Sequence, residues 1–231
     1  MLDFSRRDAQ VAELMDDPAC DLRLLFNTYR QFARINALLS RWHSVYRRHL
    51  RPALPRGRPV RMLDIGFGGG DVVRALARWA RADGIDLRIT AIDTDARALA
   101  FVRELEWPDT VSFQQASTGD LRASGRRYDA VISNAVLHHL DETAAAALLR
   151  DSRALAETVV VHNDLVRSAA AYALFSTFVA PFFRDSFAAT DGQRSIRRSW
   201  TVPELRRLAG PGWTVRPLAP FRQLALWQSS A

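Results

Sequence analysis

The residues best suited to bind a ligand lie between Val60 and Asp71. An apolar run there reaches Asp64 and then breaks into four glycines, at positions 66, 68, 69 and 70. Residues 72–82 follow with apolar side chains at helical spacing. A strand, a glycine turn and a helix in this order form the first half of a βαβ nucleotide-binding unit, in which glycine lets the backbone come close to a ligand.

The details of this turn decide which nucleotide it suits. A dinucleotide fingerprint would need glycine in place of Asp71, and a phosphate-binding loop would need a lysine, which the chain lacks. What remains is an acid followed by glycines at alternate positions: Asp64, Gly66, Gly68 and Gly70. This pattern resembles motif I of the class I methyltransferases that depend on S-adenosylmethionine (SAM). An acid suits this cofactor because SAM carries a sulfonium and an ammonium group.

The resemblance implies further cofactor contacts. Asp93 ends the next apolar strand, residues 87–93, where a nucleotide-binding unit places the acid that accepts both ribose hydroxyls. Asp95 can cap the following helix and leave Asp93 free. Many relatives carry an acid for the adenine amino group where this chain has Ser117. We expect SAM, and its product S-adenosylhomocysteine (SAH), to contact Asp64, Gly66, Phe67, Gly68, Gly70, Asp93, Thr94, Ser117 and Asn134.

Residues 128–140 form the second informative segment. An apolar strand ends at Ser133 and Asn134, and the adjacent pair His138 and His139 follows. The segment resembles motif IV of small-molecule methyltransferases, whose strand end lies beside the sulfonium. Histidine best removes a phenol proton near neutral pH, so we expect His139, or else His138, as the catalytic base. Adjacent residues diverge by about 100° on a helix, so we expect no metal ion between them.

Two further segments are expected to cover the cofactor. Residues 22–39 have apolar residues at helical spacing and resemble the N-terminal lid of methyltransferases acting on quinone and polyketide-like molecules. Residues 165–199 form a long insertion with an aromatic-rich helix over 169–180, which could shape a pocket, pack on the domain or form a dimer interface. Asp191-Gly192 indicates a turn within it. We expect substrate contacts from Tyr29, Asp164, Arg167 and Tyr172, although Tyr29 could equally be a core aromatic.

These motifs require a sheet that brings their strand ends to one edge. The apolar segments predict an α/β fold, a Rossmann-like doubly wound sheet of seven strands, with the terminal antiparallel hairpin that class I methyltransferases add. We divide the chain into an N-terminal helical lid (1–55), a SAM-binding core (56–164), a helical cap insertion (165–200), and a last helix with the hairpin (201–231).

Composition narrows the class of protein. The chain has 231 residues, a net charge of +7 carried by arginine, and a single cysteine. One cysteine excludes an internal disulfide and a cysteine-based zinc site. No apolar run reaches the roughly 18–20 residues of a membrane span, and no signal-peptide pattern opens the chain, so we expect a cytoplasmic protein. The arginines are spread without interleaved aromatic residues, which disfavours nucleic acid as a partner.

The resemblance implies a SAM-dependent methyltransferase of a small aromatic molecule, as a monomer or homodimer. The run Asn163-Asp164-Leu165-x-Arg167-Ser168 is similar to bacterial methyltransferases of polyketide and phenolic-lipid biosynthesis, which favours O-methylation of such a secondary metabolite. Three alternatives stay open: a C-methyltransferase of a quinone-like ring, an RNA methyltransferase, and a non-catalytic SAM-binding subunit. The segment 133–136 lacks the Asn-Pro-Pro-Tyr-like motif of base methylation. Asp71 disfavours an NAD-dependent oxidoreductase.

Overall fold

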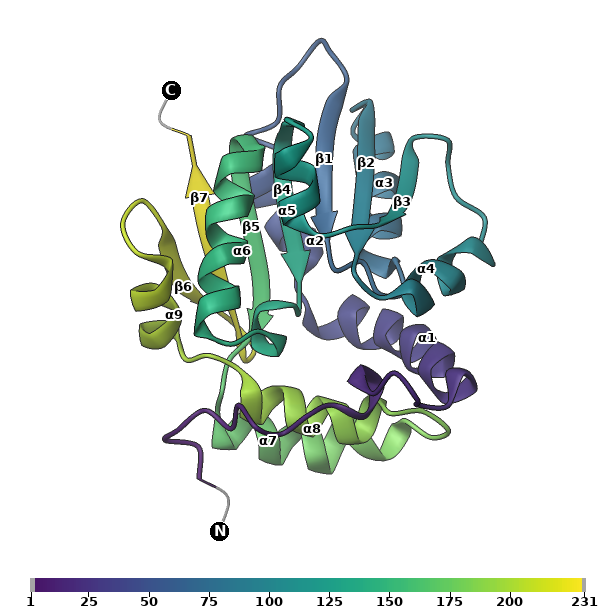
Figure 1. Cartoon of the computed structure of the whole chain (residues 1–231), viewed down its shortest axis with the longest axis vertical. Helices are drawn as coiled ribbons and strands as arrows, with labels where there is room; N and C mark the ends of the chain where they lie inside the picture. The colour runs from purple at the N-terminus through teal and green to yellow at the C-terminus, as the bar shows by residue number, and fades with distance from the viewer. Residues whose placement is uncertain (1–2, 230–231) are drawn as a thin grey trace.

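The computed structural model describes residues 3–229, which form one seven-stranded sheet with helices on both faces (Figure 1). The strand order is β3-β2-β1-β4-β5-β7-β6. The first five strands pair in parallel, and β7 runs antiparallel to its neighbours β5 and β6. The strands are β1 (Val60–Ile65), β2 (Leu87–Asp93), β3 (Val111–Gln115), β4 (Tyr128–Asn134), β5 (Ala156–Leu165), β6 (Thr214–Leu218) and β7 (Arg222–Gln228). The predicted fold class, including the terminal hairpin, is confirmed.

The order of the strands creates a crevice at the centre of the sheet. β1 pairs with β2 on one side and with β4 on the other. The connections that leave β1 and β4 therefore diverge at the carboxyl ends of these strands, and open α/β sheets bind ligands at such a point. The glycine turn follows β1 and the paired histidines follow β4, so the topology brings the two informative segments together.

Helices cover both faces because the central strands are apolar on both sides. Met62 and Leu63 are adjacent in β1 and wholly buried, and they belong to different hydrophobic clusters. One cluster includes Leu76 of α3, and the other includes Leu149 of α6. The helices that connect the first five strands are α3 (Asp71–Ala82), α4 (Ala96–Arg103), α5 (Thr118–Ala123) and α6 (Glu142–Leu155), and α9 (Val202–Ala209) precedes β6.

A separate group of helices lies across the carboxyl ends of the parallel strands. Figure 1 shows α1, α7 and α8 below the sheet, with the purple start of the chain running along α8. The group comprises η1 (Leu14–Asp16), α1 (Leu22–Leu39), α7 (Ala169–Leu174), η4 (Phe175–Val179), η5 (Ala180–Phe182) and α8 (Ala188–Arg198). The helix α2 (Trp42–Val45) and the π-helical turn η2 (Tyr46–Leu50) instead pack beside α3, where the Tyr46 hydroxyl donates to the carboxylate of Asp83 at 2.8 Å. None of the helices within residues 3–229 is long and apolar enough to cross a membrane.

One local expectation in the insertion is confirmed and one is wrong. Residues 169–180 are helical as expected, although the hydrogen-bonding pattern changes along them from the α-helix α7 through the π-helical turn η4 to the start of the 3-10 turn η5. Asp191 and Gly192 lie inside α8 and form no turn. Glycine is needed there for packing, because a Cβ on Gly192 would lie 2.3 Å from Cζ of Phe175. The Asp191 carboxylate accepts the backbone N–H groups of Leu14 and Met15, at 2.7 and 3.0 Å, and so ties the N-terminal segment to α8.

Candidate functional site

A cavity of about 930 Å³ lies between the sheet and the covering helices. This volume is at the upper end of the range typical of ligand pockets, roughly 300–1,000 Å³. One wall consists of the glycine turn and the carboxyl ends of β1, β2 and β4. The opposite wall is apolar and is formed by Phe32, Ile35 and Leu39 of α1 and by Leu174, Phe175, Phe178 and Val179 of the insertion. The insertion therefore contributes directly to the cavity.

The glycine turn shows why its residues must be glycine. Gly66 has φ +74°, in the left-handed region, and a Cβ on it would lie 2.5 Å from Cγ2 of Val136. Gly70 has φ +73°, and a Cβ there would lie 2.6 Å from the ring of Trp107. Gly66 lines the cavity, whereas Gly70 does not. Gly70 precedes the first residue of α3 and serves packing, so its predicted cofactor contact receives no support from the cavity.

Three carboxylates converge on the same wall. Asp64, Asp71 and Asp93 all line the cavity. Burial raises the pKa of Asp64 to about 8, and the charges of Asp71 and Asp93 act in the same direction. Burial also raises the pKa of Asp71 and of Asp93. Like charges held together out of water are relieved by a cationic ligand, so this wall suits a positively charged group.

Asp93 is positioned by the two turns that flank it. Its Oδ2 atom accepts the N–H of Gly68 at 3.0 Å, and its Oδ1 atom accepts the N–H of Asp95 at 3.0 Å. Each carboxylate oxygen has a second lone pair, which leaves Asp93 able to accept two further hydroxyl donors. Asp95 caps α4 through the N–H of Arg97, as expected.

The other expected cofactor residues combine a structural contact with a place in the cavity wall. Phe67 packs edge-on against Phe113, with ring centroids 4.9 Å apart. Ser117 forms a capping box with Asp120 at the start of α5. Asn134 accepts the indole N–H of Trp42 at 2.9 Å. Eight of the nine expected residues line the cavity: Asp64, Gly66, Phe67, Gly68, Asp93, Thr94, Ser117 and Asn134.

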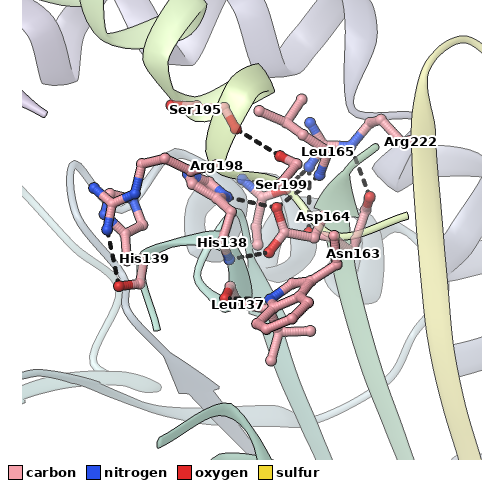
Figure 2. A network of polar contacts seen from close by, with 12 residues as sticks. Leu137, His138, His139, Asn163, Asp164, Leu165, Ser195, Arg198, Ser199 and Arg222 are labelled. Atoms are coloured by element: carbon pink, nitrogen blue, oxygen red, sulfur yellow. Dashed lines mark hydrogen bonds and ion pairs between the residues drawn. The ribbon is translucent and has the colours of Figure 1, made fainter. Parts of the chain in front are cut away.

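The paired histidines lie in a short 3-10 turn, η3 (Leu137–His139), and their rings nevertheless approach each other. Their ring centroids are 4.3 Å apart and their planes differ by 35°. His138 is buried, and its Nδ1 atom lies 2.6 Å from Oδ1 of Asp164 (Figure 2). His139 is partly exposed, and its Nδ1 atom lies 3.2 Å from Oδ2 of Asp16. The expectation that the two rings face different directions is wrong.

Glu13 completes this group. Its carboxylate is almost wholly buried and lies 3.4 Å from Nε2 of His138 and 3.8 Å from Nε2 of His139. Burial lowers the pKa of His138, but the charges of Asp164 and Glu13 outweigh this effect and raise it to about 9. A ring that keeps both protons at neutral pH does not accept a substrate proton. Of the two expected bases, His139 is therefore the better placed.

Glu13 and Asp16 were missed by sequence reasoning. Both lie in the N-terminal segment, and Asp16 is separated from its partner His139 by 123 positions. A single acidic residue in a polar segment does not indicate which distant residue it will contact. Asp71, whose residue type excludes a dinucleotide motif, also lines the cavity with its carboxylate.

Three of the four expected substrate residues lie outside the cavity. Asp164 is buried behind His138. Arg167 is buried in an ion pair with Glu204, 2.6 Å from its Oε1 atom. Tyr172 packs against the ring of Phe4. These side chains hold the covering segments in place. Tyr29 alone lines the cavity, on the glycine-turn side, where Gly69 approaches it so closely that a Cβ would lie 2.9 Å from the Tyr29 Cβ.

Comparison with known proteins identifies the central segment of the chain. Residues 62–158 match a family model described as a methyltransferase domain. These residues contain the glycine turn, Asp93 and the paired histidines, and they supply β2, β3, β4 and most of β1 of the sheet. This segment is a class I, SAM-dependent methyltransferase domain.

Related methyltransferases cover most of the chain. The chain is 29% identical to the uncharacterised methyltransferase Rv0089 of Mycobacterium tuberculosis, over 73% of this chain and 86% of that protein. The fold resembles the plantazolicin methyltransferase BpumL in complex with SAH, with a TM-score of 0.61 at 13% identity over 94% of this chain and 93% of that one. It also resembles human N-acetylserotonin methyltransferase in complex with SAM, with a TM-score of 0.63 at 11% identity over 97% of this chain and 65% of that one.

The residues of the methyltransferase domain fit the cofactor that such domains use. The ammonium and sulfonium groups of SAM would offset the charges that raise the pKa of Asp64. Asp93 keeps free lone pairs for two hydroxyl groups. The cavity extends beyond this wall into the apolar half, which leaves room for a second molecule.

Proposed function

We propose that the protein binds SAM against the glycine turn and methylates a hydroxyl group of a small aromatic molecule of the phenolic or polyketide type. The observation that carries the proposal is the division of one cavity into two halves. One half has three carboxylates at a glycine turn, and the other has phenylalanine and aliphatic side chains. A polar cluster of Glu13, His138 and His139 also lines this cavity.

In the cofactor half of the cavity, the side chains bind SAM and orient it. Asp93 accepts the ribose hydroxyls, while Asp64 and Asp71 attract the ammonium group. Thr94, Ser117 and Phe67 surround the remainder of the nucleoside. The cofactor supplies an activated methyl group, so that placement of the acceptor provides most of the rate acceleration.

In the acceptor half, the apolar residues of α1 and η4 exclude water and hold an aromatic ring. The acceptor hydroxyl points to the polar cluster, where Nε2 of His139 accepts its proton. Positioned general bases typically accelerate such reactions by about 10²–10⁴-fold. Asp16 keeps the His139 ring in place through its Nδ1 atom.

The related structures do not narrow the acceptor further, since their names refer to compounds as different as plantazolicin and N-acetylserotonin. The aromatic acceptor is proposed from the character of the wall. Phe32, Phe175 and Phe178 line it together with aliphatic residues.

Transfer of an isotope-labelled methyl group from SAM to a panel of substituted phenols and naphthols tests the proposal. We expect label in aryl methyl ethers and a loss of at least about 100-fold in kcat for His139→Ala. His43→Ala is the matched control, because His43 is an exposed histidine outside the cavity. Label bonded to a ring carbon, or unchanged turnover of His139→Ala, would contradict the proposed chemistry.

A further inference from the structure

The Glu13 carboxylate has one close hydrogen-bond donor and faces two imidazole nitrogens at longer distances. The hydroxyl of Ser195 donates to its Oε1 atom at 2.8 Å. The two imidazole Nε2 atoms lie 3.4 and 3.8 Å from its oxygens, beyond the roughly 2.7–3.2 Å of an N–H···O hydrogen bond. A nearly wholly buried carboxylate thus faces two ring nitrogens without close contact to either.

The three side chains lie close enough together to hold one metal ion. One ligand atom from each of Glu13, His138 and His139 can be chosen so that all three lie within 4.8 Å of one another. Zinc bonds to nitrogen and oxygen are about 2.0–2.2 Å long, which places adjacent ligand atoms of a tetrahedral site roughly 3.3–3.6 Å apart. Two histidines and one glutamate are also a known ligand set of catalytic zinc sites.

Each of the three side chains has a second partner that fixes its orientation. Asp164 binds Nδ1 of His138 at 2.6 Å, and Asp16 lies 3.2 Å from Nδ1 of His139. Ser195 holds Glu13. A carboxylate on the far nitrogen of a histidine is typical of metal ligands, because it directs the other nitrogen to the ion. Figure 2 shows Asp164 directly beside the His138 ring.

The charges around the cluster also permit a cation. Glu13, Asp16 and Asp164 contribute three carboxylates. The guanidinium of Arg198 pairs with Asp16 at 3.1 Å and lies 4.0 Å from Glu13. It also donates to the carbonyl oxygen of His139 at 2.9 Å, as Figure 2 shows. The guanidinium is thus held on the Asp16 side of the cluster.

We propose that Glu13, His138 and His139 bind a Zn²⁺ ion whose open coordination position faces the cavity and takes the acceptor oxygen. This inference rests on the proposed function and refines its proton step. The ion lowers the pKa of the acceptor hydroxyl, the O–H bond breaks and the proton passes to solvent. The O–CH₃ bond then forms while the S–CH₃ bond of SAM breaks, and the electron pair of that bond stays on sulfur. With zinc bound, both Nε2 atoms are ligands, and His139 no longer serves as the base.

Titration of the metal-free protein, without a polyhistidine tag, tests the site. Co²⁺ replaces Zn²⁺ as a visible probe, and its absorption bands report coordination directly. We expect the bands to saturate at one equivalent of Co²⁺ and to disappear when Zn²⁺ is added. Glu13→Gln and His139→Ala should weaken Co²⁺ binding by at least about tenfold, and Asp16→Asn by about 10–100-fold. The matched controls Glu106→Gln and His43→Ala, both exposed and outside the cavity, should bind as wild type does.

Calorimetry with SAH on the same preparation separates this inference from the proposed function. Asp93→Ala should lose SAH and keep the Co²⁺ spectrum. A wild-type protein that binds SAH but shows no saturable Co²⁺ bands would overturn the zinc site and leave the methyltransferase proposal intact. Equal Co²⁺ affinity of wild type, Glu13→Gln and His139→Ala would overturn it as well. His139 is partly exposed, so its variant should fold even where a His138 variant does not; thermal melting checks this.

Discussion

At the scale of single residues, the acidic wall links cofactor binding to pH. Asp64 has a pKa of about 8 because it is buried beside Asp71 and Asp93, so it holds its proton at neutral pH in the ligand-free protein. A bound ammonium group favours the carboxylate form. Binding therefore releases this proton, and a lower pH opposes binding.

We accordingly expect the affinity for SAM to rise between about pH 5.5 and pH 7, by up to about tenfold per pH unit for one released proton. Calorimetry in buffers of different ionisation enthalpy measures the proton directly. Asp64→Asn has no titrating group at this position and should bind with little pH dependence. An affinity of the wild type that is flat over this range would show that Asp64 does not face the ammonium group.

The residues in and around the cavity differ in how far the sequence predicts their positions. Asp64 and Asp93 lie next to the glycine turn or at the end of the following strand, so local spacing identifies them. Glu13 and Asp16 reach the histidines only through the folded N-terminal segment, and no local pattern marks them. The burial of Asp164 and Arg167 could not be predicted from the sequence either, because each side chain pairs with a residue far away in the chain.

At the scale of elements, the buried side chain of Asp191 is one of the contacts that hold the N-terminal segment against α8. The carboxylate of Asp191 accepts the backbone N–H groups of Leu14 and Met15, and these residues belong to η1, which follows Glu13 and ends with Asp16. The sequence indicated a turn at Asp191-Gly192. Tertiary packing of Gly192 on Phe175 overrides that local preference, which no single-segment pattern could show.

Replacement of Asp191 should therefore loosen the segment. In Asp191→Ala the two amides lose their acceptor, and an unsatisfied buried donor costs about 1–3 kcal/mol. We expect amide hydrogen exchange of residues 12–17 to accelerate at least about fivefold, while β4 keeps its protection. Asp109→Ala, at an exposed site, is the control. Unchanged exchange in Asp191→Ala would show that the segment is held by its other contacts.

At the scale of the whole molecule, the sheet order was predictable because the strands and their connections alternate in the chain. Buried apolar strands, glycine turns and amphipathic helices follow one another in the order that a doubly wound sheet requires. The shape of the cavity was not predictable, since it depends on how α1 and the insertion meet over the strand ends.

The net charge of +7 also acts at this scale. It attracts any polyanion, and non-specific binding of nucleic acid has dissociation constants of about 10⁻⁴–10⁻⁶ M. We expect single-stranded RNA to bind no more tightly than about 1 µM at physiological salt, and to dissociate as salt is raised, as measured by fluorescence anisotropy. Nanomolar and sequence-dependent binding would instead support the RNA methyltransferase alternative.

Calorimetric titration with SAH tests the central claim most directly, because it needs no substrate. Wild type, Asp93→Ala and the control Asp86→Ala are compared; Asp86 is an exposed aspartate in the turn before β2. The account predicts micromolar binding by wild type and Asp86→Ala, weakened at least about tenfold in Asp93→Ala, which loses a charged hydrogen-bond acceptor. Folded wild-type protein that binds neither SAH nor SAM would contradict it.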